Sequence, residues 1–175
     1  MAMTERKAIL PVAPWIGALL LGGCGAPTED FIEAEGSYGD GRPLIFREQM
    51  RRMVCHATMG QAPCVSLAGL RLTGPSTEVL RGLRITYTPT GITAQTTYSS
   101  GLFQPVTFYV VQARGDRFVD SVVHGGQISF TSIATGPGET TSGTFRDMVL
   151  RRANDQGVEQ TVVVLSRGSF QYLQP

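Results

Sequence analysis

Few residue sets in this chain have the types and spacing that chemistry needs. Asp116, Asp120 and His124 recur every four residues, so on a β-strand they would share one face. Two carboxylates and an imidazole on one face could bind a metal ion or carry out general acid-base catalysis. Charged side chains beside a turn are also what a solvated surface presents, and we favour this second interpretation. The sequence thus predicts no catalytic residue, no metal site and no cofactor.

Known catalytic motifs do not appear elsewhere in the sequence. There is no Gly-x-Ser-x-Gly nucleophile elbow, no phosphate-binding Walker loop and no His-Glu-x-x-His zinc motif. We therefore expect that the protein is not an enzyme. Active-site residues can also converge in space without a local motif, so an enzyme remains an alternative.

The N-terminal segment has the layout of an export signal. Arg6 and Lys7 precede an uncharged apolar run, Ala8–Leu21, which is too short to span the roughly 30 Å hydrocarbon core of a bilayer. Pro11 and Pro14 argue against the alternative, a buried core helix, because proline destabilises a helix interior. We therefore expect a signal peptide.

The end of this leader, Leu21-Gly22-Gly23-Cys24, resembles the lipobox of bacterial lipoproteins. The resemblance implies cleavage before Cys24 and acylation of this residue, which would anchor the protein in a membrane. Because Gly25 and not aspartate follows the cysteine, it also implies sorting to the outer membrane, facing the periplasm or the cell surface. The expected organisation is a signal peptide at 1–23, a lipidated tether at 24–37 and a folded domain at 38–175.

Two cysteines remain once Cys24 is assigned to lipid. Cys55 and Cys64 enclose eight residues, and the bacterial envelope is oxidising enough to pair them. We expect a structural disulfide, which would stabilise the fold by roughly 2–3 kcal/mol. Two free thiols or a metal pair are the alternatives. Only His56 stands close by as a further ligand, which is too few for a zinc site.

The composition predicts a packed, β-rich domain. Hydrophobic residues make up 42% and charged residues 17% of the chain, which excludes intrinsic disorder. The 21 glycines and 10 prolines indicate frequent turns and few long helices. Removing Glu5, Arg6 and Lys7 with the leader leaves 13 of the 15 basic and 13 of the 14 acidic residues. This balance attracts neither nucleic acid nor anionic lipid headgroups, so the expected membrane contact is through the acyl chains, with no nucleic acid partner.

Alternating side chains predict about eight β-strands. A period of two runs through Val65–Leu72 and Leu83–Thr88, and β-branched residues dominate two further runs. The remaining expected strand segments are Val106–Val111, Phe118–Val123, Gln127–Ile133, Thr144–Leu150 and Thr161–Leu165. Glycine-containing and polar breaks separate these segments without a long helical pattern. The sequence therefore predicts an all-β fold, an antiparallel two-sheet sandwich.

The segment before Cys55 is the one helical candidate. Phe46, Met50, Met53 and Val54 recur at helical spacing with charged residues between them, which indicates a short amphipathic helix. Three of these residues, Phe46, Met50 and Val54, also share strand parity, so a strand is the alternative.

Two triplets in the C-terminal half repeat the order glycine, hydroxyl residue, phenylalanine. Gly143-Thr144-Phe145 and Gly168-Ser169-Phe170 lie 25 positions apart. Such a glycine can mark a kink into a strand whose aromatic side chain enters the core. Together with Gly126–Thr131, these segments resemble small β-sandwich lipoproteins of diderm bacteria. This resemblance implies a fold and no activity.

Three functional classes follow. The first is a lipid-anchored, non-catalytic structural or accessory subunit of a cell-envelope assembly, for example in transport, secretion or motility, with an envelope protein as its partner. The second is an anchored binding module for a sugar, lipid or peptide; the aromatic side chains that could serve it are Tyr87, Tyr98, Phe103 and Tyr109. The third is an envelope enzyme or an enzyme inhibitor.

Arginine suits protein interfaces, because it is weakly hydrated and binds carboxylates bidentately. The candidate interface residues are two arginine pairs, Arg51 with Arg52 and Arg151 with Arg152.

Overall fold

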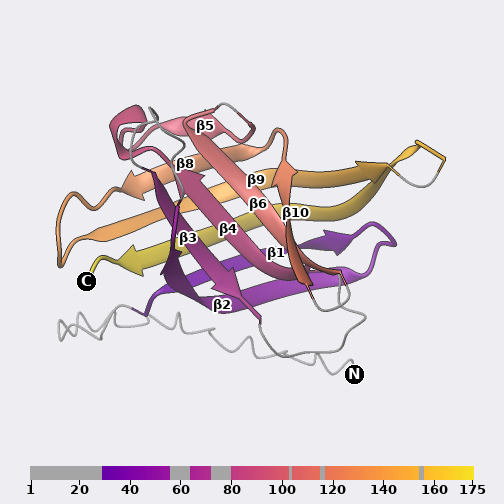
Figure 1. The fold of residues 1–175 in the computed structure, drawn as a ribbon, viewed down its shortest axis with the longest axis horizontal. Coiled ribbons are helices and arrows are strands. Elements are labelled where there is room, and N and C mark those ends of the chain that lie inside the picture. Colours follow the sequence, from indigo (N-terminus) through magenta and orange to yellow (C-terminus); the bar gives the residue numbers. More distant parts are fainter. Residues whose placement is uncertain (1–28, 56–63, 72–79, 103, 115–116, 154–155) are drawn as a thin grey trace, which may run out of the picture.

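All strands in the part of the chain that the structure describes belong to one antiparallel sheet, in the order β5-β8-β9-β10-β1-β2-β3-β4-β6-β7 (Figure 1). The computed structural model describes residues 29–55, 64–71, 80–102, 104–114, 117–153 and 156–175. These ranges contain no α-helix and one short 3-10 turn, Pro89–Gly91. The strands are β1 Phe31–Tyr38, β2 Pro43–Met53, β3 Val65–Leu70, β4 Leu80–Tyr87, β5 Thr97–Ser99, β6 Val106–Arg114, β7 Arg117–Val123, β8 Gln127–Ser132, β9 Thr140–Ala153 and β10 Glu159–Leu173.

The strands form where apolar and polar side chains alternate. In β2, for example, Leu44 and Phe46 are buried, whereas Ile45 and Arg47 between and beside them are exposed. Successive side chains of a strand point to opposite faces of the sheet. The alternation therefore defines an inner face, which carries the core, and an outer face.

The sheet curls over like half of a barrel, so that its inner face packs against itself. Figure 1 shows β4 and β6 crossing in front of β8, β9 and β10. The ring centroids of Phe108 in β6 and Phe145 in β9 lie 4.7 Å apart, and those of Tyr87 in β4 and Phe130 in β8 lie 5.2 Å apart. We call β8, β9, β10 and β1 one half of the sheet and β3, β4, β6 and β7 the other half. These aromatic contacts join the two halves and fill the space between them.

The expected all-β, antiparallel class is confirmed, but a sandwich of two separate sheets is not found. β2 joins the two halves, because Pro43–Gln49 pair with β1 and Met50–Met53 pair with β3. The halves still pack face to face, as the layers of a sandwich do. Alternation along a strand reports which side is buried and not which strand lies next to it, so the sequence alone could not distinguish the two arrangements.

The helix expected before Cys55 is wrong, because this segment is the second half of β2. Phe46 and Met50 are four residues apart, a spacing that places two side chains on one face of a helix and also on one face of a strand. Both are buried on the inner face, while Val54 beyond the strand is 79% exposed.

The expected boundary between tether and domain is also placed too late. Phe31–Tyr38 is β1, a strand paired with β10 on one side and β2 on the other. Its acidic residues obscured the strand pattern in the sequence: Glu33 lies on the outer face, while Ile32 and Ala34 are buried. With β1, β2 and the three-residue β5, the sheet has ten strands and not about eight.

The two glycine-hydroxyl-phenylalanine triplets pair with each other. In the ladder between β9 and β10, Gly143 lies opposite Phe170, and Phe145 lies opposite Gly168. A Cβ atom at Gly143 would lie 2.7 Å from Cζ of Phe170, and one at Gly168 would overlap the Phe145 ring. The repeat therefore marks one reciprocal packing unit, in which each ring covers the glycine of the neighbouring strand.

Candidate functional site

A groove of about 830 Å³ crosses the outer face of five neighbouring strands, β8, β9, β10, β1 and β2. Its floor includes residues of the inner face, such as Ala34, Phe46 and Gly168, which the groove reaches from the outer side of the sheet. We call it the outer-face groove. Its polar lining comes from residues that alternate with the core residues along each strand.

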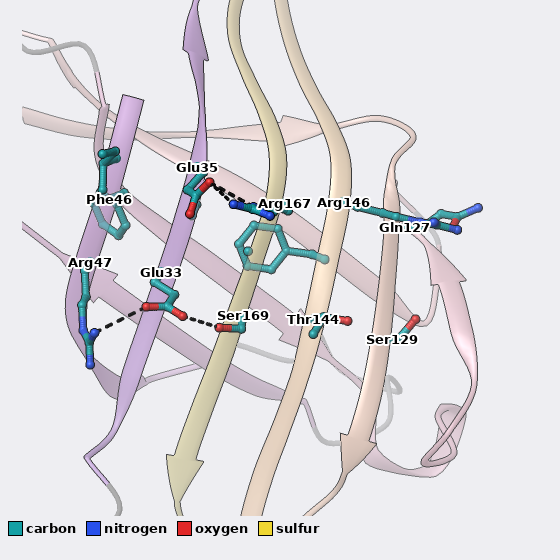
Figure 2. A pocket seen from close by; sticks show the side chains of 14 residues that line it. Glu33, Glu35, Phe46, Arg47, Gln127, Ser129, Thr144, Arg146, Arg167 and Ser169 are labelled. Carbon is teal, nitrogen blue, oxygen red and sulfur yellow. Dashed lines mark hydrogen bonds and ion pairs between the residues drawn. The ribbon is translucent and has the colours of Figure 1, made fainter. Parts of the chain in front are cut away.

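The strand register arranges the lining side chains in two rows that run across the strands (Figure 2). We call the first the long-chain row; it consists of Gln127, Arg146, Arg167, Glu35 and Ile45. We call the second the hydroxyl row; it consists of Ser129, Thr144, Ser169, Glu33 and Arg47. Because neighbouring strands lie about 4.8 Å apart, each row presents one side chain at that interval.

In the long-chain row, two arginines are oriented by their neighbours. Nε and Nη2 of Arg167 donate to Oε2 of Glu35 at 2.9 and 2.7 Å. Nε and Nη2 of Arg146 donate to Oε1 of Gln127 at 2.9 and 2.6 Å. Both guanidinium groups are thus held by two hydrogen bonds each, and charge-assisted pairs of this kind fix geometry as well as adding energy.

In the hydroxyl row, the carboxylate of Glu33 interacts with both of its neighbours. Oγ of Ser169 donates to Oε1 of Glu33 at 2.8 Å, and Nη1 of Arg47 lies 3.6 Å from Oε2 of the same carboxylate. The Arg47 guanidinium also lies over the ring of Phe31, 5.4 Å from its centroid. The two oxygens of Glu33 are therefore shared between a hydroxyl and a cation.

The charges of the outer-face groove nearly balance. Three arginines and two glutamates line it, and each glutamate has an arginine partner. Such exposed ion pairs contribute at most about 1 kcal/mol each to stability, because water screens them. Their main effect is to hold donors and acceptors in fixed positions around the groove.

The expected surface role of Asp120 agrees with its contacts. Its carboxylate lies 2.8 Å from Nη2 of Arg84, whose guanidinium lies 4.1 Å from the centroid of the Tyr109 ring. His124 follows the end of β7 and is exposed. Asp116 lies outside the described residues. Within the described ranges, no three His, Cys, Asp or Glu residues are grouped so that they could bind a metal ion.

Three of the four aromatic residues considered for ligand binding are described, and none of these three lines the outer-face groove. Tyr87 is 4% exposed, its hydroxyl lies 3.3 Å from Oγ1 of Thr141, and burial raises the pKa of this tyrosine. The hydroxyl of Tyr98 accepts a hydrogen bond from the backbone N–H of Thr93 at 2.6 Å. Tyr109 lies beneath Arg84 on the other half of the sheet. Phe103 lies outside the described residues.

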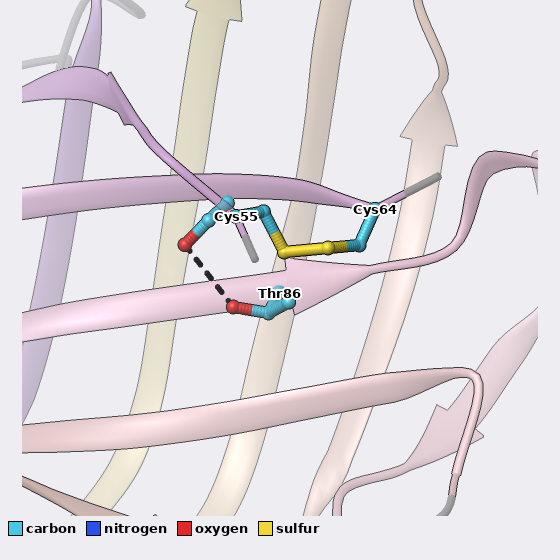
Figure 3. Close-up of a disulfide and its surroundings, with 4 residues drawn as sticks. Cys55, Cys64 and Thr86 are labelled. Carbon is cyan, nitrogen blue, oxygen red and sulfur yellow. Dashed lines mark hydrogen bonds between the residues drawn. A yellow bond between two sulfur atoms is a disulfide. The ribbon is translucent and has the colours of Figure 1, made fainter. Parts of the chain in front are cut away.

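The expected disulfide is present between Cys55 and Cys64, whose Cα atoms lie 5.9 Å apart (Figure 3). It connects the end of β2 to the start of β3, next to Thr86 of β4. The disulfide therefore excludes the two alternatives, free thiols and a metal pair, in this structure. Cys24 and His56 lie outside the described residues.

The structure does not bring the two candidate arginine pairs together. Arg51 and Arg52 pair with β3 beyond the point where β2 leaves β1, near the Phe31 end of β1. Arg151 and Arg152 pair with the first residues of β10, near the other end of β1. The length of β1, about 26 Å for eight residues, separates them. The two pairs do not form one interface patch.

Comparison with known proteins gives no match: no protein-family model, no curated protein and no solved structure resembles the chain closely enough to be matched. In the part of the chain that the structure describes, no helix has the length and apolar character needed to cross a membrane. The functional argument therefore depends on the residues of this chain.

Sequence reasoning missed most residues of the outer-face groove. Glu33 and Glu35 were placed in the tether, and no property of Gln127 or Arg146 marks them along the chain. The triplet repeat is the sequence feature that could have indicated the groove. Its middle residues are Thr144 and Ser169, and they face outward because the phenylalanines next to them are buried in the core.

Proposed function

We propose that this protein is a lipid-anchored outer-membrane lipoprotein that acts as a non-catalytic accessory subunit of a cell-envelope assembly and binds a polar partner through its outer-face groove. The anchor part of the proposal is supported by the lipobox-like segment Leu21-Gly22-Gly23-Cys24. The binding part is supported by the two rows of oriented polar side chains.

The start of β1 supports a close association of the folded domain with the bilayer. Only residues 25–30 separate Cys24 from β1, which begins at Phe31. A chain of this length spans at most about 25 Å when fully extended. An acylated Cys24 would therefore keep the outer-face groove within reach of components at the membrane surface.

The observation that carries the binding role is the mutual orientation of side chains in the long-chain row. A polar face that only contacts water does not require side chains in fixed positions, and fixing long side chains costs conformational entropy. Because Arg167 with Glu35 and Arg146 with Gln127 are already held, a partner would not have to order them on binding.

The anchor is tested by Cys24→Ser. We expect this variant to accumulate as an uncleaved, unacylated precursor, measured by intact mass and membrane fractionation. Normal maturation of the variant would contradict the anchor.

The binding role is tested by affinity purification of the acylated protein from detergent-solubilised envelope. We expect the double variant Glu35→Ala with Arg167→Ala to lose a stoichiometric component that the wild type retains. The matched control is Asp40→Ala with Arg42→Ala, which removes another exposed pair of 2.7 Å outside the groove. Equal recovery with both variants would contradict a role for the groove in an envelope assembly.

A further inference from the structure

We infer that the outer-face groove binds an uncharged, hydroxyl-rich chain, a glycan strand, that lies across the strands of the sheet. This inference rests on the proposed function in one respect: it takes the groove as the binding surface. It adds the chemical class of the ligand and the direction in which the ligand lies.

The direction follows from the two rows. They run side by side across β8, β9, β10, β1 and β2 and form the two walls of the groove. From the first strand to the fifth, the rows extend about 19 Å at the usual strand spacing. A linear polymer with a repeat comparable to the strand spacing can meet one pair of side chains per strand, and a chain of sugar rings has such a repeat.

The floor of the groove favours a ligand that is recognised through side chains. β8, β9, β10 and β1 are paired on both sides here, so most backbone N–H and C=O groups beneath the groove take part in the ladders of the sheet, whereas Pro43–Gln49 of β2 pair with β1 on one side. A peptide that binds by adding a strand would run along the edge of one strand, whereas a ligand that lies across all five strands meets their side chains. Recognition therefore depends on hydroxyl, amide, guanidinium and carboxylate groups.

The charge pattern favours an uncharged ligand. Glu33 and Glu35 oppose a phosphorylated or sulfated polymer, and three arginines oppose a polycation. Within each row, groups that only donate, such as Arg167, stand beside groups that only accept, such as Glu35. A sugar hydroxyl both donates and accepts, so it can satisfy either group without a net charge.

Unused hydrogen-bonding capacity remains after the internal contacts are made. A guanidinium carries five N–H donors, and the hydrogen bonds from Arg167 to Glu35 use its Nε and Nη2 groups. Both bonds reach Oε2 of Glu35, which leaves Oε1 of this carboxylate without a bond to Arg167. Oriented groups with spare donors and acceptors are suited to vicinal hydroxyls.

Ile45 supplies an apolar contact at one end of the long-chain row. Its side chain is 79% exposed although it lies in the middle of a strand and beside charged residues. Exposed aliphatic residues are common, but here the side chain lines the groove. The C–H face of a sugar ring can pack against it, while the ring hydroxyls reach the polar row.

The experiment is calorimetric titration of the acylated protein, in a detergent without a sugar headgroup, with a β-1,4-linked hexamer of N-acetylglucosamine. A sulfated hexasaccharide is titrated in parallel. We expect the neutral hexamer to bind and the sulfated one to bind at least tenfold more weakly. The double variant Glu35→Ala with Arg167→Ala should lower the affinity for the neutral hexamer roughly tenfold, because hydrogen bonds to charged groups are lost.

The control variant Asp40→Ala with Arg42→Ala should leave this affinity unchanged. A second variant, Gln127→Ala, removes a neutral residue of the same row and should also weaken binding, and circular dichroism checks that each variant is folded. Absence of binding, stronger binding of the sulfated hexamer, or equal affinity of the groove variant would each overturn the inference. So would a dimer in sedimentation experiments that only the groove variants dissociate, because the groove would then bind a second copy.

The two proposals fail separately. If the groove variant loses the envelope component but the wild type binds no glycan, the inference about the ligand is wrong and the binding role of the groove stands. If the wild type binds the hexamer through the groove but affinity purification shows no difference between variants, the accessory role is wrong and the glycan site stands.

Discussion

At the scale of single residues, one carboxylate oxygen of Glu139 accepts three hydrogen bonds in the turn between β8 and β9. One carboxylate oxygen, Oε2, accepts from the backbone N–H of Thr135 at 2.6 Å, from the Thr135 hydroxyl at 2.8 Å and from the N–H of Gly136 at 3.1 Å. These bonds favour the charged form, so they lower the pKa of Glu139, the Thr135 backbone bond most of all.

This lowered pKa makes the stability of the turn dependent on pH. The stabilisation is complete above the pKa of the unfolded chain, about 4.5, and is lost as the pH falls through the lower pKa of the folded state. We therefore expect Glu139→Gln to reduce the free energy of unfolding at pH 7, and the difference from the wild type to shrink between pH 5 and pH 3. Urea unfolding at several pH values measures both quantities; a difference independent of pH would contradict the assignment.

At the scale of elements, β9 and β10 are the strands that connect the core to the outer-face groove. Their paired triplets place two phenylalanine rings on the inner face and Thr144 with Ser169 on the outer face. The glycines opposite the rings leave the space that the rings occupy. A side chain there would push the ring away from the strand, and the shift would affect both faces.

Gly168→Ala tests this packing unit. The added methyl group would overlap the Phe145 ring and the carbonyl oxygen of Glu33. We expect it to lower the free energy of unfolding by about 1–3 kcal/mol, the usual cost of overpacking a core. The measurement is urea unfolding against Gly136→Ala, a glycine with no atom within 4 Å of the new methyl group. Equal stability of the two variants would show that the ring moves at no cost.

At the scale of the whole molecule, the two edges of the sheet meet at Ser100. The edge strands are β5 and β7, and Ser100 directly follows β5. Its Oγ donates to the carbonyl oxygen of Val123 at 2.8 Å and accepts from the N–H of Phe108 at 2.9 Å. Its carbonyl oxygen accepts from the N–H of Gly125 at 2.9 Å. This one buried residue therefore connects the edges of the curled sheet at one end.

Ser100→Ala should loosen this connection. The change removes both side-chain bonds and leaves the buried N–H of Phe108 without this acceptor, which costs about 1–3 kcal/mol. Thermal unfolding measures the loss. Ser166→Ala is the matched control, because its exposed hydroxyl also donates to a backbone carbonyl, that of Glu35. We expect the control to change stability by less than about 0.5 kcal/mol. A similar effect of both variants would mean that closure at Ser100 does not matter.

The sequence by itself determined most strands and, where apolar and polar residues alternate, which side of the strand is buried. Seven expected segments are strands, β3, β4, β6, β7, β8, β9 and β10, because a period of two is a local property that adjacent residues carry. The disulfide between Cys55 and Cys64 was likewise predicted, because these two cysteines remain once Cys24 is assigned to lipid and an oxidising compartment would pair them. The spacing of Phe46 and Met50 fits both a helix and a strand, so the local pattern could not decide between these two structures.

Only the tertiary structure decided which strands are neighbours, and the outer-face groove depends on that. Glu35 and Arg167 are 132 positions apart and meet because β1 lies between β10 and β2. Pairing of distant strands is set by packing of the whole core and by register, which no local pattern encodes. The same cause explains why the expected two sheets are one: the path of β2 from one half to the other is fixed by its partners and not by its own residues.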